Sequence, residues 1–161
     1  MTSNAFANNS ETIKISQSHT LTLNDVEFDK STGEIEGYTA DYKDIVIPDN
    51  FDGVSVTSIG DYAFSENTLM SVSIPNSVTE IGKRAFAYNA LTSVNIPNSV
   101  TKIGESAFAY NALTNVSIPN SVIKIGKSAF SSNALTSVSI PNSVTEIGES
   151  AFDEDVIITR I

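Results

Sequence analysis

The chain of 161 residues has no cysteine, no tryptophan and only one histidine, His19. The lack of cysteine excludes disulfides, thiolate zinc sites and cysteine nucleophiles. A single imidazole with no cysteine and no Ser-His-Asp arrangement around it is a poor candidate for a general base, so we interpret His19 as a surface residue. We therefore expect no catalytic residue, no metal site and no cofactor.

Basic residues are also scarce. The chain has nine Lys and Arg against 19 Asp and Glu, a formal net charge of −10. Nucleic-acid binding needs clustered cations, so we expect no nucleic-acid partner. The acids are concentrated in residues 1–66, which hold 12 of them and three lysines. No apolar run reaches the roughly 18 residues of a membrane helix, so we expect no membrane span.

What the chain has in abundance is repetition. Ile-Pro pairs begin at positions 74, 96, 118 and 140, and Ile-Gly pairs at 59, 81, 103, 125 and 147, each 22 residues after the last. Ala-Phe pairs keep the same step from position 63 to position 151. Self-similarity at a fixed period of this length is typical of a solenoid, in which each repeat packs only against its neighbours.

Each unit predicts one strand and a return segment. Leu91, Val94 and Ile96 are expected to face inward, and Ser93 and Asn95 outward, because side chains alternate along a strand. The proline that follows ends the strand, since it cannot donate a ladder hydrogen bond. The glycine of each Ile-Gly pair is predicted to occupy a bend with positive φ.

Three columns of side chains are predicted to stack along the array. The first is a phenylalanine spine, the second an asparagine ladder that satisfies backbone groups at the turns, and the third a column of charges that alternate in sign. They comprise Phe64, Phe86, Phe108, Phe130 and Phe152; Asn67, Asn89, Asn111 and Asn133, with Asp155 in the fifth place; and Asp61, Lys83, Glu105, Lys127 and Glu149.

The pattern divides the chain into three segments. Residues 1–9 are expected to be disordered or the remnant of a signal peptide cleaved after Ala7, since Ala5-Phe6-Ala7 has the small-x-small spacing of a cleavage site; a chance match is the alternative. Residues 10–44 are predicted to form an N-terminal cap that contains a β-hairpin. Residues 45–161 are predicted to form the repeat array, with a C-terminal cap from about residue 153.

The cap also contains a spacing that resembles a calcium loop. Acidic and hydroxyl side chains between Asp25 and Glu36 match most ligand positions of an EF-hand. Lys30, however, stands where such a loop needs glycine, and Val26 and Phe28 alternate with charged residues as in a strand. We therefore interpret this segment as a hairpin and not as a metal site.

The repeated unit Leu-Thr-Ser-Val-x-Ile-Pro-Asn-Ser-Val-Thr-x-Ile-Gly-x-x-Ala-Phe resembles the bacterial leucine-rich repeats of the BspA-like, or Treponema pallidum, type. The match is strong over residues 69–152, partial over 45–64 and absent over 1–44. The resemblance implies a right-handed leucine-rich-repeat coil with a parallel β-sheet on the concave face and a mostly irregular or short-helical convex side. The chain departs from the general consensus, which has Asn or Cys where this chain has Ser99, Ser121 and Ser143.

The resemblance also implies a location and a function. Members of this family are mostly secreted or cell-surface proteins, and several are adhesins for host matrix proteins. It therefore implies a secreted or surface binding module without catalytic activity, with a protein ligand, such as a matrix protein, or a glycan. The alternative is a structural spacer or self-assembly unit of a larger surface protein. A third hypothesis is recognition of an ordered surface, such as ice or a glycan, by the regular Ser and Thr columns.

The candidate binding surface is the predicted concave face and its rim. Solenoids usually bind partners on their concave sheet, and binding hot spots favour Tyr and Arg. We predict that Arg84, Tyr88 and Tyr110 form a rim near the turn that leads into each strand. The face itself consists of two columns of small polar side chains, namely Ser71, Ser93, Asn115 and Ser137, and Ser73, Asn95, Ser117 and Ser139.

Overall fold

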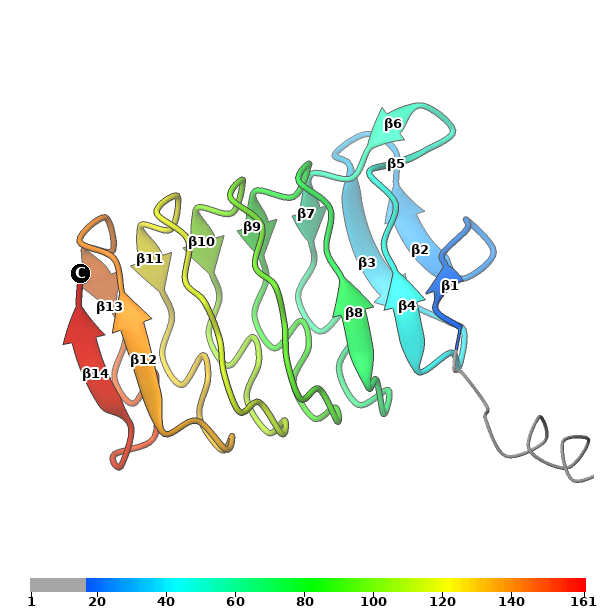
Figure 1. Ribbon diagram of the computed structural model, residues 1–161. Helices are drawn as coiled ribbons and strands as arrows, with labels where there is room; N and C mark the ends of the chain where they lie inside the picture. Colours follow the sequence, from blue (N-terminus) through cyan, green and yellow to red (C-terminus); the bar gives the residue numbers. More distant parts are fainter. Residues whose placement is uncertain (1–16) are drawn as a thin grey trace, which may run out of the picture.

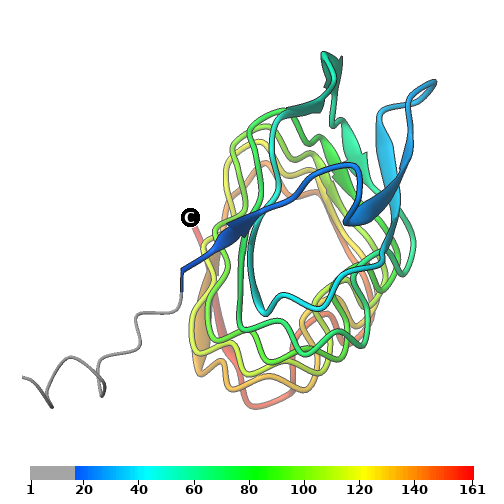
Figure 2. The same cartoon turned by 90° about the vertical axis from the view of Figure 1, so that its right-hand side faces the viewer.

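Each 22-residue unit makes one coil of a solenoid. The computed structural model describes residues 17–161. Successive coils stack side by side from the N-terminal to the C-terminal end (Figure 1). Seen along the stacking axis, the coils superimpose as a closed ring (Figure 2). The predicted repeat solenoid is therefore confirmed.

One side of the coil carries the predicted strands, each parallel to the next. Strands β1 (His19–Thr20), β4 (Asp44–Val46) and β8 (Ser71–Ser73) form one sheet. Single bridges continue it from Ser73 to Asn95 and from Asn95 to Ser117. Strands β12 (Ser137–Ile140) and β14 (Ile157–Arg160) pair at the C-terminal end. The outer surface of this side, which bears the two predicted columns of Ser and Asn, is called the serine face below.

The opposite side of the coil is a second sheet of seven strands, in the order β13-β11-β10-β9-β7-β3-β2. Its outer surface is called the charged face below. Five of its strands are two-residue segments that recur once in each coil. The strands are β2 (Val26–Asp29), β3 (Glu34–Tyr38), β7 (Ser58–Ile59), β9 (Glu80–Ile81), β10 (Lys102–Ile103), β11 (Lys124–Ile125) and β13 (Glu146–Ile147).

The resemblance implied a convex side that is irregular or has short helices. The structure instead shows this second sheet, and no helix occurs in residues 17–161. The physical reason is the ladder between coils. The amide of Thr101 donates to the carbonyl of Thr79 (2.8 Å), and the amide of Gly104 donates to the carbonyl of Ile81 (2.8 Å). Amides committed to the preceding coil cannot also bond within a helix.

The predicted N-terminal hairpin is confirmed. Strands β2 and β3 pair antiparallel, and Gly33 lies between them with φ 77°. Strand β3 then pairs parallel with β7, so the hairpin continues the charged side of the solenoid and covers its first coil. A second small hairpin, β5 (Asn50–Phe51) and β6 (Val54–Ser55), projects beside it (Figure 1). The predicted signal-peptide remnant lies outside the described residues.

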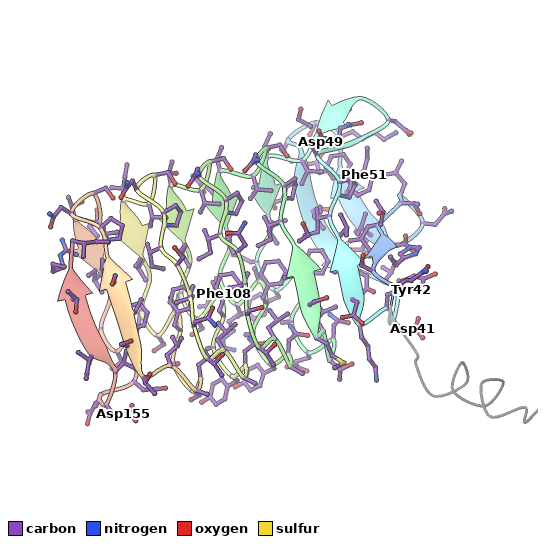
Figure 3. The ribbon with its side chains drawn as sticks, viewed as in Figure 1. Asp41, Tyr42, Asp49, Phe51, Phe108 and Asp155 are labelled. Carbon is purple, nitrogen blue, oxygen red and sulfur yellow. The ribbon has the colours of Figure 1, made fainter. Side chains whose placement is uncertain are left out.

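The core is a stack of identical side chains, as predicted. Neighbouring rings of the five-phenylalanine spine lie 5.2–5.4 Å apart and within 10° of parallel. Phe108 lies inside the coil near the middle of the stack (Figure 3). The inward strand residues Leu91, Val94 and Ile96 are buried beside the spine, which confirms the predicted alternation.

The bend glycines are needed for a reason that differs from the predicted one. Positive φ is found at Gly33 and Gly53, and not at the glycines of the Ile-Gly pairs. Instead, the coils approach so closely at Gly104 that an added Cβ would lie 2.6 Å from the carbonyl carbon of Gly82. The left-handed conformation falls two residues later, at Ser106 (φ 53°) and its equivalents. The prediction of positive φ at these glycines is therefore wrong.

The asparagine ladder seals the turns as predicted. The side-chain amide of Asn111 donates to the carbonyls of Phe86 (2.9 Å) and Phe108 (3.2 Å), and its Oδ1 accepts from the amide of Leu91 (3.0 Å). The serines that depart from the consensus do not share this role, because the hydroxyls of Ser99 and Ser121 are buried without a hydrogen-bond partner.

At the C-terminal end of the ladder the acceptor is Asp153 and not the predicted Asp155. The carboxylate of Asp153 accepts from the amides of Ser132 (2.8 Å) and Asn133 (3.3 Å). In the first coil of the ladder, the equivalent amide, that of Asn67, donates to Oδ1 of Asn89, one period later (3.1 Å). The repeat therefore changes its acceptor position in the last coil.

Asn111→Ala is expected to lower the free energy of unfolding by about 2 kcal/mol, because it leaves the amide of Leu91 without its acceptor, and such a group left unpaired costs about 1–3 kcal/mol before relaxation. Urea denaturation followed by circular dichroism measures the loss. The control is Asn67→Ala at the start of the ladder, where the side-chain amide donates to Ser65 alone (2.8 Å) and a smaller loss is expected. Equal losses in the two variants would contradict the bridging role of Asn111.

Candidate functional site

The serine face is polar and exposed. Every residue of the two predicted columns is exposed. The parallel pairing places Ser73, Asn95 and Ser117 directly beside one another across neighbouring coils. The hydroxyl of Ser71 donates to Asp44 (2.7 Å), which ties the first position of the column to the preceding coil. The face offers many donors and acceptors but no large anchor.

The predicted rim residues form an aromatic surface. Tyr88 and Tyr110 are 44% and 51% exposed, and their rings stack with centroids 4.5 Å apart and planes 5° from parallel. Both residues have φ 57°, so the same left-handed backbone positions both side chains. Stacking of the two rings contributes about 0.5–1.5 kcal/mol in addition to the effect of the apolar surface that the pair buries.

Arg84 joins this rim through a residue that the sequence analysis did not select. The guanidinium of Arg84 lies over the ring of Tyr62, 5.8 Å from its centroid, and Tyr62 is 48% exposed. Such a cation–π contact is worth about 0.5–1 kcal/mol at an exposed site. Tyr62 precedes Arg84 by 22 residues in the sequence, so the period of the repeat could have predicted that the two side chains lie side by side.

The rim and the serine face lie in consecutive parts of each coil. Tyr88 lies in the segment that runs from β9 toward the strand position of Ser93, and Tyr110 lies in the equivalent segment before Asn115. These connecting segments run along the lower edge of the stack (Figure 1). The rim comprises Tyr62, Arg84, Tyr88 and Tyr110.

The charged face carries a depression that the sequence analysis did not predict. It has a volume of about 740 Å³ and lies over β3, β7, β9 and β10. Its lining includes the carboxylates of Glu34, Glu36 and Glu80 and the ammonium groups of Lys83 and Lys102. Lys102 lies 4.0 Å from Glu80, and Lys83 lies 3.5 Å from Glu105. These exposed pairs contribute about 0–1 kcal/mol each and help to fix the register of the coils.

His19 is half-buried and paired, in contrast to the surface residue expected. Its Nε2 lies 3.1 Å from Oδ2 of Asp25, and its ring stacks on Tyr42 with centroids 3.6 Å apart. The same Oδ2 accepts from the amide (2.8 Å) and the hydroxyl (2.9 Å) of Thr22. Burial alone would raise the pKa of Asp25, but these hydrogen bonds outweigh it and hold the pKa below its usual range. The cluster joins β1 to Asp25, the residue directly before β2.

Among residues 17–161, no group of three or more His, Cys, Asp or Glu side chains has a geometry that could hold a metal ion. Asp41 and Asp49 lie at opposite edges of the N-terminal end of the solenoid (Figure 3). In Asp29, the hydroxyl and amide of Ser31 lower the pKa of the carboxyl by donating hydrogen bonds to it (2.6 and 2.8 Å), as in a tight turn.

The described residues form no helix with the length and hydropathy needed to cross a membrane. A comparison with curated proteins found no match.

Two solved structures are similar to the chain. The first is the Treponema pallidum leucine-rich repeat protein TpLRR, with a TM-score of 0.71 and 26% identity, over 85% of this chain and 68% of that protein. The second is the pneumococcal vaccine antigen PcpA, with a TM-score of 0.60 and 24% identity. This match covers 71% of the present chain but only 28% of PcpA, so it supports the fold alone.

A family model matches most of the chain. Six copies of the model described as the BspA type leucine-rich repeat region match residues 37–159. The match extends toward the N-terminus beyond the four regular units, into the hairpin that caps the first coil. The predicted resemblance is thereby confirmed, and the chain belongs to the BspA-type leucine-rich repeat family.

Proposed function

We propose that the chain is a non-enzymatic binding module of the secreted or cell-surface type, and that its partner contacts the serine face and the rim. The family supports the general class, since leucine-rich repeat solenoids typically serve protein–protein interaction. The adhesin-like role, with a matrix protein or a glycan as ligand, is the finer part of this proposal.

One observation carries the choice of surface. The rim holds three exposed tyrosines and an arginine, in a cation–π contact of Arg84 with Tyr62 and a stacked pair of Tyr88 with Tyr110. Tyr and Arg are among the residue types that supply most binding energy in interfaces, and the rigid Tyr ring offers a large contact area at a low entropy cost. The serine face beside them supplies small donors and acceptors that a partner can approach closely.

Electrostatics also favours this surface over the charged face. The depression on the charged face is lined by charged side chains, among them the ion pair of Lys102 with Glu80, and a partner there would have to remove these charges from water. The serine face bears no charge in its two columns. A partner that covers it therefore removes few charged groups from water, which keeps the desolvation cost low.

A binding screen against immobilised matrix proteins and glycans tests the proposal. We expect a saturable signal from the wild-type protein and at least a tenfold loss of affinity (about 1.4 kcal/mol) in the double variant Ser93→Glu with Asn115→Glu, because two carboxylates would be buried under the partner.

The control for this variant is Lys102→Gln with Lys124→Gln on the charged face. Both double variants change the net charge by −2, because the first adds two carboxylates and the control removes two ammonium groups. We expect the control to bind as the wild type does. No signal across the panel from a folded protein would contradict the binding proposal and favour the spacer. An equal loss in both variants would contradict the serine face as the binding surface.

A further inference from the structure

The turn that carries the stacked tyrosines of the rim repeats with one backbone conformation. Tyr88, Tyr110 and Ser132 follow one another at the 22-residue period, with φ 57°, 57° and 56°. The amide of Tyr88 donates to the carbonyl of Ala109 (3.0 Å), and the amide of Tyr110 donates to the carbonyl of Ser131 (3.0 Å). The three turns are therefore stacked in register, and their side chains leave the backbone in the same direction. Ser132 stands where a third ring of the stack would begin.

Ser132 is too short to cover the ring that precedes it. Tyr110 is 51% exposed, and among the described residues the only ring that stacks on it is Tyr88, with centroids 4.5 Å apart. A ring at position 132 would cover the second face of Tyr110 in the same way, but the serine side chain ends at its hydroxyl. One face of the Tyr110 ring is therefore open toward the next coil.

Hydroxyl groups border this open ring face. Ser132 is exposed and Ser128 is half-buried, and the amide of Ser131 donates to the carbonyl of Ser128 (3.1 Å), so one tight turn holds both serines. The carboxylate of Asp153 accepts from the amide of Ser132 (2.8 Å) and fixes this turn from the following coil. The open face of Tyr110, together with the hydroxyls of Ser128 and Ser132, is called the tyrosine step below.

The charges around the tyrosine step narrow the class of ligand. Arg84, the one cation of the rim, lies over the ring of Tyr62 and precedes Ser132 by two coils. Lys127, directly before Ser128, pairs with Glu149 on the charged face (3.7 Å). Because these cations are already engaged and the chain has a net charge of −10, the step disfavours an anionic ligand. A neutral ligand fits it better.

A sugar ring has the two properties that the step requires. Its apolar C–H face can lie flat on the electron-rich face of an aromatic ring, and its hydroxyls, like those of serine, both donate and accept hydrogen bonds. A prolyl or aromatic side chain of a protein partner would also stack on Tyr110, but it would offer no hydrogen bond to the serine hydroxyls. The combination of ring face and hydroxyls therefore favours a carbohydrate.

We propose that the tyrosine step binds one ring of a neutral glycan. The sugar takes the third place in the stack of Tyr88 and Tyr110, and its hydroxyls exchange hydrogen bonds with Ser128 and Ser132. This inference rests on the proposed function, because it names the ligand class for one part of the same binding surface.

The decisive variant is Ser132→Tyr, which places the chain's own ring in the third position of the stack. The backbone conformation at Ser132 is the one that already carries tyrosine at Tyr88 and Tyr110, so we expect the variant to fold with a urea midpoint at or above that of the wild type. Glycan affinity is expected to fall at least tenfold, because the added ring covers Tyr110. A rim that needs only aromatic area would instead bind more tightly.

The matched control is Glu66→Tyr. Glu66 precedes Tyr88 by one period and has φ 58°, so the new ring extends the same stack at its other end and leaves the tyrosine step open. We expect this control to bind as the wild type does. A further variant, Tyr110→Leu, keeps an apolar side chain but removes the flat ring, and its affinity is expected to fall at least tenfold. It decides the question if Ser132→Tyr fails to fold.

The probes are neutral oligosaccharides of glucose, galactose, mannose and N-acetylglucosamine, with sialylated glycans as the anionic comparison. Isothermal titration calorimetry measures affinity, and saturation-transfer difference NMR identifies the sugar protons that lie against the protein. We expect at least one neutral glycan to bind saturably, with transfer strongest to the C–H protons on one face of one ring. Stronger binding of the sialylated glycans would contradict the neutral class.

Three further outcomes would overturn the proposal: no binding of any neutral glycan, unchanged affinity in Ser132→Tyr or Tyr110→Leu, and an equal loss in Glu66→Tyr. A matrix protein that binds the wild type and Ser132→Tyr alike, while no glycan binds, would overturn the carbohydrate site and leave the proposed binding module standing. If neither matrix proteins nor glycans bind the folded chain, both the step and the proposed function are contradicted.

Discussion

Phe108→Ala is expected to lower the free energy of unfolding by about 3–5 kcal/mol, the range for truncation of a fully buried phenylalanine. Phe108 is fully buried, and its ring stacks on Phe86 and Phe130 at 5.4 Å on each side. The coils are tied to one another by backbone ladders at their surface, so the core cannot collapse into the cavity without breaking those bonds. Urea denaturation followed by circular dichroism measures the loss.

The matched control is Phe152→Ala at the C-terminal end of the spine. Among the described residues, Phe152 has only Phe130 as a ring neighbour, and it lies in the coil in which Ile147 is 42% exposed. Its truncation leaves a site that water can enter, so we expect a loss smaller by about 1 kcal/mol or more. If both variants lost the same stability, the spine would not act as a stack in which interior positions have two neighbours.

Gly126→Ala is expected to cost about 3 kcal/mol, at the upper end of the range for overpacking. An added Cβ at Gly126 would lie 2.5 Å from the amide nitrogen of Glu105 and 2.6 Å from the carbonyl carbon of Gly104. Both atoms belong to the backbone of the neighbouring coil, so neither can move unless the two coils separate. The expected result is a lower urea midpoint with an unchanged slope.

Gly37→Ala serves as the control for close packing. At Gly37, the nearest atoms that an added Cβ would meet belong to the side chain of Glu27, at 3.0–3.7 Å, and that side chain can rotate away. We expect a change within about 1 kcal/mol for this variant. A loss at Gly37 as large as that at Gly126 would indicate that the cost comes from glycine flexibility and not from contact between coils.

The strict period made much of the core predictable. When a residue recurs at every turn of a stack, translation alone places each copy beside the next, so Phe86 must lie against Phe108 whatever the exact backbone path. The same reasoning predicted the asparagine ladder and the charge column, with Lys83 beside Glu105. These features depend on the period and on side-chain chemistry, and both are visible in the sequence.

The features that depend on backbone distances were not predictable in this way. The second sheet consists largely of two-residue strands such as β10, which are too short to show an alternation. The need for glycine at Gly104 comes from the approach of a neighbouring coil and not from its own φ. The change of acceptor from Asp155 to Asp153 occurs where the repeat ends and its translation no longer applies.

The candidate site was predictable in part. Arg84, Tyr88 and Tyr110 were predicted because Tyr and Arg are residue types that binding hot spots favour. Tyr62 occupies the Arg84 column one period earlier, in the imperfect first repeat, and was therefore overlooked. The pairing of His19 with Asp25 joins residues of the irregular cap, where no repeat indicates which side chains meet.

The most direct test of the proposed binding surface is the affinity of the double variant Tyr88→Ala with Tyr110→Ala for the ligand that the wild type retains in the binding screen. Ile123→Ala, which removes an exposed apolar side chain from the charged face, is the control. The proposal predicts at least a tenfold loss in the tyrosine variant, about 1.4 kcal/mol, and wild-type affinity in the control, with both variants folded by circular dichroism. Wild-type affinity in the tyrosine variant would contradict the rim as the binding site.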